Sequence, residues 1–399
     1  MRKVQSDLDR RGEVIEWIRD HAHSLITMES EDSLIDLAAL GPMVSDSKII
    51  GFGESTRGAR NAHQLYIIKH QALRFLVESL NFRSLVLEMH WALAIQLNEY
   101  LRTGNGDPRI LLSRAWGPLQ TEEVLEVILW MRSYNQQNPS DSLQIFGGYS
   151  GPIHLEAFDV VFDYVQSTAP ERMEELKTHF SILRPSRDMD EHAKWYSKQQ
   201  NKQAFIDHAQ QVYILICNLP TYNGYELAIQ YARFILEFYE HQGIDNLSID
   251  QRFAKNIILW HKHTGNKIVY WGGIGHTANN NMLKSGYSQG SYLRDYFGKD
   301  YVSIGLTFHY GLGQNPISFP PSDFVEAVLS KAKLDMYILD LHVKKPESVK
   351  AWLNTPTKVR AIGPYYDPQT EPPHINGLLS SWFDILLHTH EVTPAISLK

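Results

Sequence analysis

Three apolar runs with the composition of buried strands each end on an ionisable side chain. The runs are 48–54, 84–88 and 267–276, and they close on Glu54, Glu88 and His276. Apolar runs of this kind are typical of strands buried in an α/β sheet. Because open α/β sheets bind their ligands beyond the carboxyl ends of the strands, the three side chains predict a functional site at that edge.

The segments around these runs predict an α/β fold with a mostly parallel central sheet flanked by helices. Apolar residues recur at helical spacing over 65–80, so the strands that end at Glu54 and Glu88 form a βαβ unit with parallel strands. Further strands are expected at 143–146, 301–308 and 335–341, with weaker signals at 358–363 and 383–389. Helices are expected at 91–102, 121–137, 290–297, 322–331 and 346–353.

The chain is expected to form one domain, 1–399, because it contains no internal repeat or low-complexity segment. The α/β core is predicted to comprise residues 45–151 and 265–395. Residues 152–264 show helical periodicity without a strand signal. We expect them to be a helical insertion that forms a lid or one wall of the active-site cleft.

Composition and charge disfavour several classes of partner. The formal charge is −7 and no Lys/Arg-rich run occurs, so we expect no nucleic acid partner. No apolar run approaches membrane-spanning length and the first residues lack a signal core, so we expect no membrane contact and a cytoplasmic location. The single cysteine, Cys217, excludes an internal disulfide, and its apolar neighbours predict a buried, unreactive thiol. The sequence sets no oligomeric state.

Four side chains are expected to meet at the carboxyl edge of the sheet: Glu54, Glu88, Tyr149 and His276. Two carboxylates and an imidazole in one place can divide the roles of general acid, general base and electrostatic stabiliser. Each also has a structural explanation, since a glutamate at a strand end often caps a helix or pairs with an arginine such as Arg57 or Arg60. Three ionisable residues at corresponding strand ends favour a catalytic function.

The sequence lacks the motifs of several common site types. No HExxH or CxxC pattern occurs, so no metal site is predicted. Gly51-Phe52-Gly53 lacks the third glycine of a dinucleotide fingerprint and no GxxxxGK[ST] occurs, so no cofactor is predicted. No GxSxG elbow supports a serine nucleophile. The expected partner is a small-molecule substrate.

A series of segments in order along the chain resembles one known family. They are Gly53-Glu54-Ser55-Thr56-Arg57-Gly58, Phe75-Leu76-Val77-Glu78, Trp130-Met131-Arg132-Ser133-Tyr134-Asn135, Gly275-His276-Thr277-Ala278, Gly290-Ser291-Tyr292-Leu293-Arg294 and Trp382-Phe383-Asp384. From residue 45 to residue 395 the chain resembles the erythromycin esterase family. The resemblance implies a hydrolase that opens macrolide lactones with an activated water, through a histidine and glutamates and without a serine nucleophile. Glu54, Glu88 and His276 match those positions. The resemblance also implies a role in antibiotic resistance or in natural-product biosynthesis.

Four departures from the family pattern fall at this site. The histidine position of the family's GExTHG loop holds Arg57, and the first histidine position of its H-N-x-H loop holds Gly273. The family's Gly-x-Asp after the third strand ends here on Tyr149, and its Arg-Asp pair before a helix reads Ile249-Asp250, with Arg252 one turn later. Because an arginine stays protonated near neutral pH, Arg57 cannot serve as a base. The chain is therefore expected to be a divergent member with altered active-site residues.

The expected catalytic residues are Glu54, Glu88, His276 and Arg57. Glu88 or His276 would act as the base, and Arg57 would stabilise developing negative charge and favour a substrate with a carboxylate. His90 is expected on the same side of its strand as Glu88, where it would partly replace the missing imidazole. Substrate contacts are expected from Arg60, His90, Tyr149, Arg252 and Gly273.

Three functions are compatible with these residues. The first is hydrolysis of an ester, lactone or amide of a small molecule by Glu/His acid–base chemistry. The second is a non-hydrolytic tailoring reaction, such as cyclisation, elimination or acyl transfer, because a cation replaces the family's histidine. The third is a non-catalytic binding protein on the same scaffold.

Overall fold

The computed structural model describes residues 2–26, 34–57, 62–149, 155–186, 189–222, 224–243, 248–280, 286–313, 316–363 and 373–398. The chain divides into two compact units. The first unit comprises Met1–Tyr149 and Asp250–Lys399, and the second comprises Ser150–Ile249. No helix of the described ranges is both long and apolar enough to cross a membrane.

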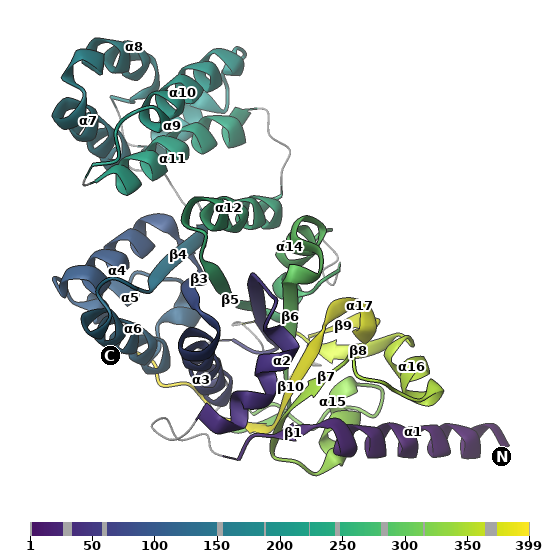
Figure 1. Cartoon of the computed structure of the whole chain (residues 1–399). Helices are drawn as coiled ribbons and strands as arrows, with labels where there is room; N and C mark the ends of the chain where they lie inside the picture. The colour runs from purple at the N-terminus through teal and green to yellow at the C-terminus, as the bar shows by residue number, and fades with distance from the viewer. Residues whose placement is uncertain are drawn as a thin grey trace. The chain divides into compact units, whose positions relative to one another are not determined.

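The first unit is built on a mostly parallel sheet (Figure 1). In spatial order its strands are β1 (His23–Ser24), β7 (Met336–Asp340), β10 (Ile385–Val392), β6 (Tyr301–Gly311), β2 (Ile49–Glu54), β5 (Lys267–Gly273), β3 (Phe82–His90) and β4 (Gln144–Tyr149). The strands from β10 to β4 are parallel to one another, whereas β7 is antiparallel to both of its neighbours. The predicted α/β class is thus confirmed. The weak strand signal at 358–363 corresponds to β8 (Thr357–Arg360), which pairs with β9 (His374–Gly377) in a separate small sheet.

Helices pack around this sheet. They are α1 (Arg2–His21), α2 (Leu40–Val44), α3 (His63–Leu80), α4 (Trp91–Thr103), α5 (Pro108–Leu112), α6 (Glu122–Gln137), α12 (Ile249–Thr264), α13 (Ile274–Thr277), α14 (Gln289–Phe297), α15 (Val325–Leu329), α16 (Glu347–Leu353) and α17 (Leu379–Trp382). α3 is an example of a helix that buries one apolar face. Its residues Leu65, Ile68, Ala72 and Leu76 recur at helical spacing and are fully buried. Lys69 interrupts this apolar stripe and is only 1% exposed.

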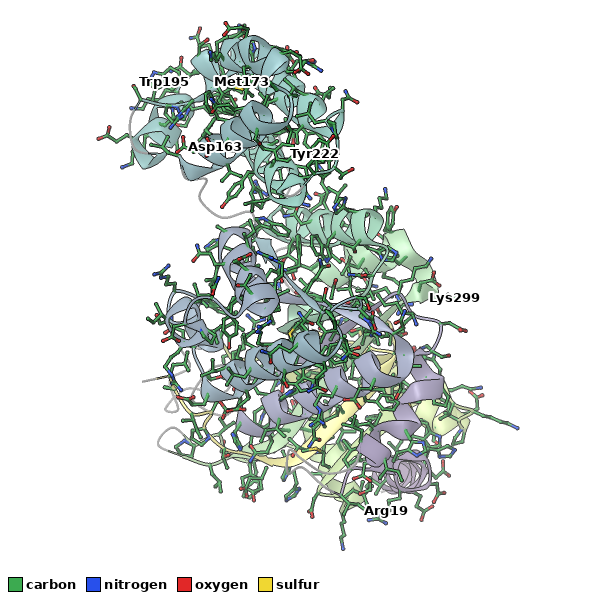
Figure 2. All side chains as sticks on the ribbon, turned by 60° about the vertical axis from the view of Figure 1, so that its left-hand side comes forward. Arg19, Asp163, Met173, Trp195, Tyr222 and Lys299 are labelled. Carbon is green, nitrogen blue, oxygen red and sulfur yellow. The ribbon has the colours of Figure 1, made fainter. Side chains whose placement is uncertain are left out.

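The second unit is a helical bundle of α7 (Glu156–Thr168), α8 (Met173–Leu183), α9 (Met189–Tyr196), α10 (Lys202–Cys217) and α11 (Tyr225–Gly243) (Figure 1). Its helices carry the side chains of Met173 and Trp195 (Figure 2). Aromatic rings fill the interior, where His192 Nε2 lies 2.9 Å from the hydroxyl of Tyr239. The expected burial of Cys217 was wrong, whereas its expected low reactivity stays a prediction. The thiol is exposed, because this last residue of α10 lies on the outer side of the helix.

The boundary of the helical unit differs from the one expected at residue 264. α12 belongs with the sheet, since all but its first residue fall in the first unit. Trp260 of α12 explains this, because its ring stacks on Phe146 at 5.0 Å and its Nε1 donates to Ser84 Oγ at 2.9 Å. Helical periodicity cannot distinguish a helix of the bundle from one that covers a sheet.

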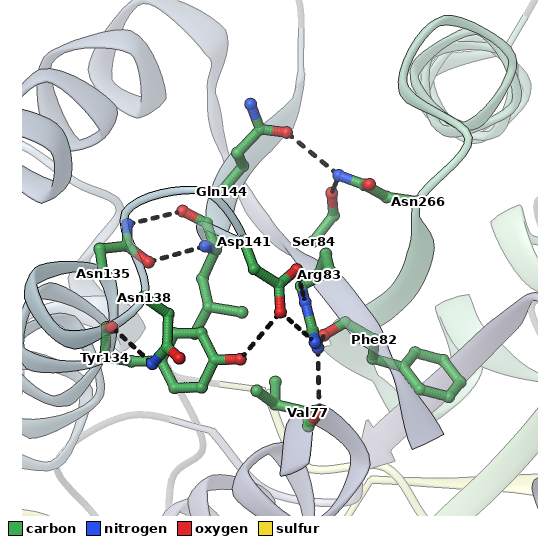
Figure 3. A network of polar contacts seen from close by, with 11 residues as sticks. Val77, Phe82, Arg83, Ser84, Tyr134, Asn135, Asn138, Asp141, Gln144 and Asn266 are labelled. Carbon is green, nitrogen blue, oxygen red and sulfur yellow. Dashed lines mark hydrogen bonds and ion pairs between the residues drawn. The ribbon is translucent and has the colours of Figure 1, made fainter. Parts of the chain in front are cut away.

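A polar network fixes the amino ends of the central strands, at the edge opposite the expected site (Figure 3). Arg83 donates to both carboxylate oxygens of Asp141 at 2.6 Å and to the carbonyl oxygen of Val77 at 2.9 Å. Asn266 donates to Ser84 Oγ at 3.0 Å and to Gln144 Oε1 at 3.1 Å. These contacts join the starts of β3, β4 and β5.

Candidate active site

The parallel sheet brings the ends of β2, β3 and β5 to one edge. Glu54 is the last residue of β2 and pairs with Gly273, the last residue of β5. α13 begins at the residue after Gly273. Glu88 lies near the end of β3. Glu54 and Glu88 are 6% and 3% exposed, so both carboxylates are held inside the protein. Buried carboxylates require partners, because desolvation penalises their charged form.

Arg57 pairs with both glutamates. Its Nη2 lies 2.6 Å from Glu88 Oε2, and its Nε lies 3.3 Å from Glu54 Oε1. The guanidinium also lies over the ring of Trp116, at 5.0 Å from the ring centroid. Burial alone would lower the pKa of Arg57, but the charges of Glu88 and Glu54 outweigh it and the pKa is raised. Arg57 is therefore a permanent cation that pairs with both carboxylates.

Lys69 is a second cation of the site, and the sequence-based analysis missed it. Its Nζ donates to Glu54 Oε2, and it lies 5.3 Å from the centroid of the Trp271 ring. Burial lowers the pKa of Lys69 and raises that of Glu54, while their mutual attraction opposes both shifts. One sequence signal was available, since Lys69 falls on the apolar stripe of α3, where a charge needs a buried partner.

His276 is paired with Asp250 of α12. His276 Nδ1 lies 2.9 Å from Asp250 Oδ1. An ionised carboxylate only accepts hydrogen bonds, so in the neutral ring Nδ1 carries the proton and Nε2 keeps its lone pair. The side chain of His276 is 29% exposed, and no described residue bonds to Nε2. Burial would lower the pKa of His276, but the bond to Asp250 and the charge of Glu88 raise it above 6.5.

Gln289, at the start of α14, extends this pair into the interior. Its Nε2 donates to Asp250 Oδ1 at 2.8 Å, and its Oε1 accepts the hydroxyl proton of Tyr270. Gln289 and Tyr270 are fully buried. Neither they nor Asp250 were among the expected site residues, although Asp250 keeps the aspartate of the family's Arg-Asp pair.

The expected substrate contacts are placed differently. Tyr149 is half-buried, at 4.8 Å from Phe253 between ring centroids, whereas His90 is exposed. His90 does not share the burial of Glu88, because the register of β3 and β4 shifts between Leu87 and His90 and interrupts the alternation of sides.

The remaining two arginines add little to the described site. Arg252 is half-buried on α12. Arg60 lies outside the described residues. The described histidines, cysteine and acidic residues contain no group of three or more that could hold a metal ion.

Comparison with known proteins assigns this fold and site to a family. The sequence model described as "Erythromycin esterase" matches residues 77–392. The chain belongs to the erythromycin esterase family, which supports a hydrolase-like role.

Three similar proteins extend this comparison. An erythromycin esterase type II from Escherichia coli is 19% identical over 333 residues, which cover 74% of this chain and 77% of that protein. The putative hydrolase YbfO of Bacillus subtilis is 25% identical, with 96% and 92% of the two chains covered. A crystal structure of a Bacillus cereus protein superimposes with a TM-score of 0.83 at 24% identity, with 98% and 99% covered. The structural match shows that the fold is shared over the whole chain.

Proposed function

We propose that this protein hydrolyses an ester, lactone or amide bond of a neutral small molecule, with His276 as general base. The observation that carries the proposal is the His276–Asp250 pair. Asp250 holds the proton on Nδ1 of the neutral ring, so that Nε2 is left unprotonated. In this mechanism Nε2 takes a proton from water while the water oxygen attacks the carbonyl carbon. The same nitrogen returns the proton to the leaving oxygen or nitrogen when its bond to carbon breaks.

Arg57 is the group that would stabilise the oxyanion formed by this attack. It cannot accept a proton, and Glu54 and Glu88 fix its guanidinium from within the protein. The two glutamates then act as anchors of Arg57 rather than as bases, since each already bonds to a cation. Tyr149 and Trp116 are the accessible aromatic side chains beside this group, and we assign them to substrate contact.

One observation favours a second function. Arg57 and Lys69 neutralise both glutamates, which leaves His276 as the single base of the described cluster. A single base beside a fixed cation also suits a cyclisation, an elimination or an acyl transfer, in which water does not enter the product. A third candidate, binding without catalysis, requires that no compound is turned over.

The test is product analysis in heavy-oxygen water. The purified protein is incubated with a panel of neutral lactones, esters and amides in H₂¹⁸O, and products are examined by mass spectrometry. Hydrolysis predicts one ¹⁸O in each acid product and loss of turnover in His276→Ala. Product without ¹⁸O would replace hydrolysis by the second function. Full turnover in His276→Ala would refute the role of His276, and saturable binding without product would leave the binding function.

A further inference from the structure

A directional chain of hydrogen bonds leads from Tyr270 to His276. Tyr270 lies in the interior of the sheet and is fully buried, and burial raises the pKa of its hydroxyl well above 10. The hydroxyl is therefore always protonated. It donates to Gln289 Oε1, which leaves the other end of the amide, Nε2, facing Asp250 Oδ1 at 2.8 Å.

The chemistry of the partners fixes the orientation of the Gln289 amide. An ionised carboxylate has no proton to donate, so the group that faces Asp250 must be the NH₂ end. The carbonyl end must then face Tyr270. A flipped amide would place two acceptors together at Asp250, where no proton would be left to bridge them. Each bond in the chain therefore supports the next.

Asp250 Oδ1 thus accepts two hydrogen bonds, one from Gln289 Nε2 and one from His276 Nδ1. The bond from Gln289 fixes the position of the carboxylate oxygen that orients the imidazole. We propose that Gln289 is a positioning residue, which acts through Asp250 to hold His276 in the tautomer with the proton on Nδ1. This inference rests on the proposed function for its catalytic meaning, but the tautomer itself can be measured without turnover.

The position of Gln289 in the fold gives this contact a wider meaning. Asp250 is the first residue after the helical unit. Gln289 therefore holds the point at which the chain re-enters the first unit, because its Nε2 donates to Asp250 Oδ1.

The experiment compares His276 in the wild-type protein and in Gln289→Met by two-bond ¹H–¹⁵N correlation NMR, above the pKa of His276. His276→Asn assigns the signal. Methionine fills a volume similar to glutamine but donates no hydrogen bond. We expect the Nδ1–H form to dominate in the wild type and the Nε2–H form to rise severalfold in Gln289→Met. With a substrate in hand, we expect kcat to fall about 10- to 100-fold with little change in KM.

Two further variants keep the inference open to refutation. Tyr270→Phe removes only the hydroxyl that orients Gln289, and it should shift the tautomer in the same direction even if Gln289→Met folds poorly. Gln251→Leu is the control, because it removes a neighbouring amide whose Oε1 accepts from the Tyr292 hydroxyl at 3.4 Å. A wild-type tautomer in both Gln289→Met and Tyr270→Phe, or an equal shift in Gln251→Leu, would overturn the inference. A shifted tautomer in a protein that turns over nothing would support it and refute only the proposed reaction.

Discussion

The guanidinium of Arg57 occupies the space that a side chain at residue 273 would fill. A Cβ built on Gly273 overlaps the Nη2 atom of Arg57 and stands against its Cζ and Nε. Two departures from the family pattern are therefore one structural change, since the arginine in the first loop needs the glycine in the second. This relationship explains how a long cation fits beside Glu54 and Glu88.

Gly273→Ala should displace Arg57 from its two carboxylates. We expect a loss of about 1–3 kcal/mol in the free energy of unfolding, because the added methyl group overpacks a buried site. Urea denaturation measures it. Gly12→Ala is the matched control, since nothing lies within 4 Å of its Cβ and alanine favours the helix. Equal stability of wild type and Gly273→Ala would contradict the tight fit.

Lys69→Met should be among the more damaging single substitutions in α3. It leaves Glu54 buried with Arg57 as its remaining cation, and we expect a loss of about 3–5 kcal/mol. The double variant Glu54→Gln/Lys69→Met no longer buries the Glu54 carboxylate without Lys69. Its loss of folding free energy should therefore be smaller than the sum of the losses in the two single variants. Lys350→Met, which breaks the exposed pair with Glu347, should change stability by less than about 0.5 kcal/mol. An additive double variant would argue against the pair.

Asp250→Asn should move the pH profile of catalysis. A histidine base works when neutral, so kcat/KM should fall as the pH falls through the raised pKa of His276. Asparagine removes the charge that raises this pKa, so the inflection should move to lower pH. The plateau should also drop about 100- to 10,000-fold, since the tautomer is no longer held. An unchanged inflection in this variant would exclude Asp250 as the partner of the base.

Neutral substrates should be preferred over anionic ones. Arg57 and Lys69 pair with Glu54 and Glu88, and Asp250 pairs with His276, so the cluster has no excess positive charge. The paired guanidinium therefore does not support the preference for a substrate carboxylate expected from the sequence. For a matched pair of esters we expect kcat/KM to be at least about tenfold higher for the neutral one. A preference for the anionic ester would show that Arg57 leaves its partners on binding.

Glu326 should make the fold less stable at neutral pH. Burial raises the pKa of its carboxyl from 4.5 to about 7, and Oε1 accepts the Arg360 N–H at 2.9 Å. The folded state favours the protonated form of Glu326. Its contribution to the free energy of unfolding is therefore complete below pH 4.5 and is lost as the pH rises through about 7. Glu326→Gln should remove this loss, which amounts to about 3 kcal/mol. Urea denaturation at pH 5 and pH 8 tests it, and an identical pH dependence in both proteins would contradict the prediction.

The sequence by itself determined the strands and the edge at which they end. Apolar runs and helical periodicity are local properties, so the sheet strands and the position of Glu54 could be predicted from them. The family pattern also identified His276 and the exchange of a histidine for Arg57. Local patterns do not report which distant side chains meet. They could not show that Asp250 hydrogen-bonds to His276 or that Gln289 hydrogen-bonds to Asp250.

Only the tertiary structure decided what the charged residues do. Whether Glu54 and Glu88 are bases or anchors depends on the cations beside them, and Lys69 reaches Glu54 from a helix that sequence periodicity assigns to the core. Tertiary packing also placed α12 with the sheet and exposed His90 through a shift in strand register. The physical reason is that ion pairing and desolvation depend on distances in space, whereas sequence patterns encode only which face of a helix or strand is apolar.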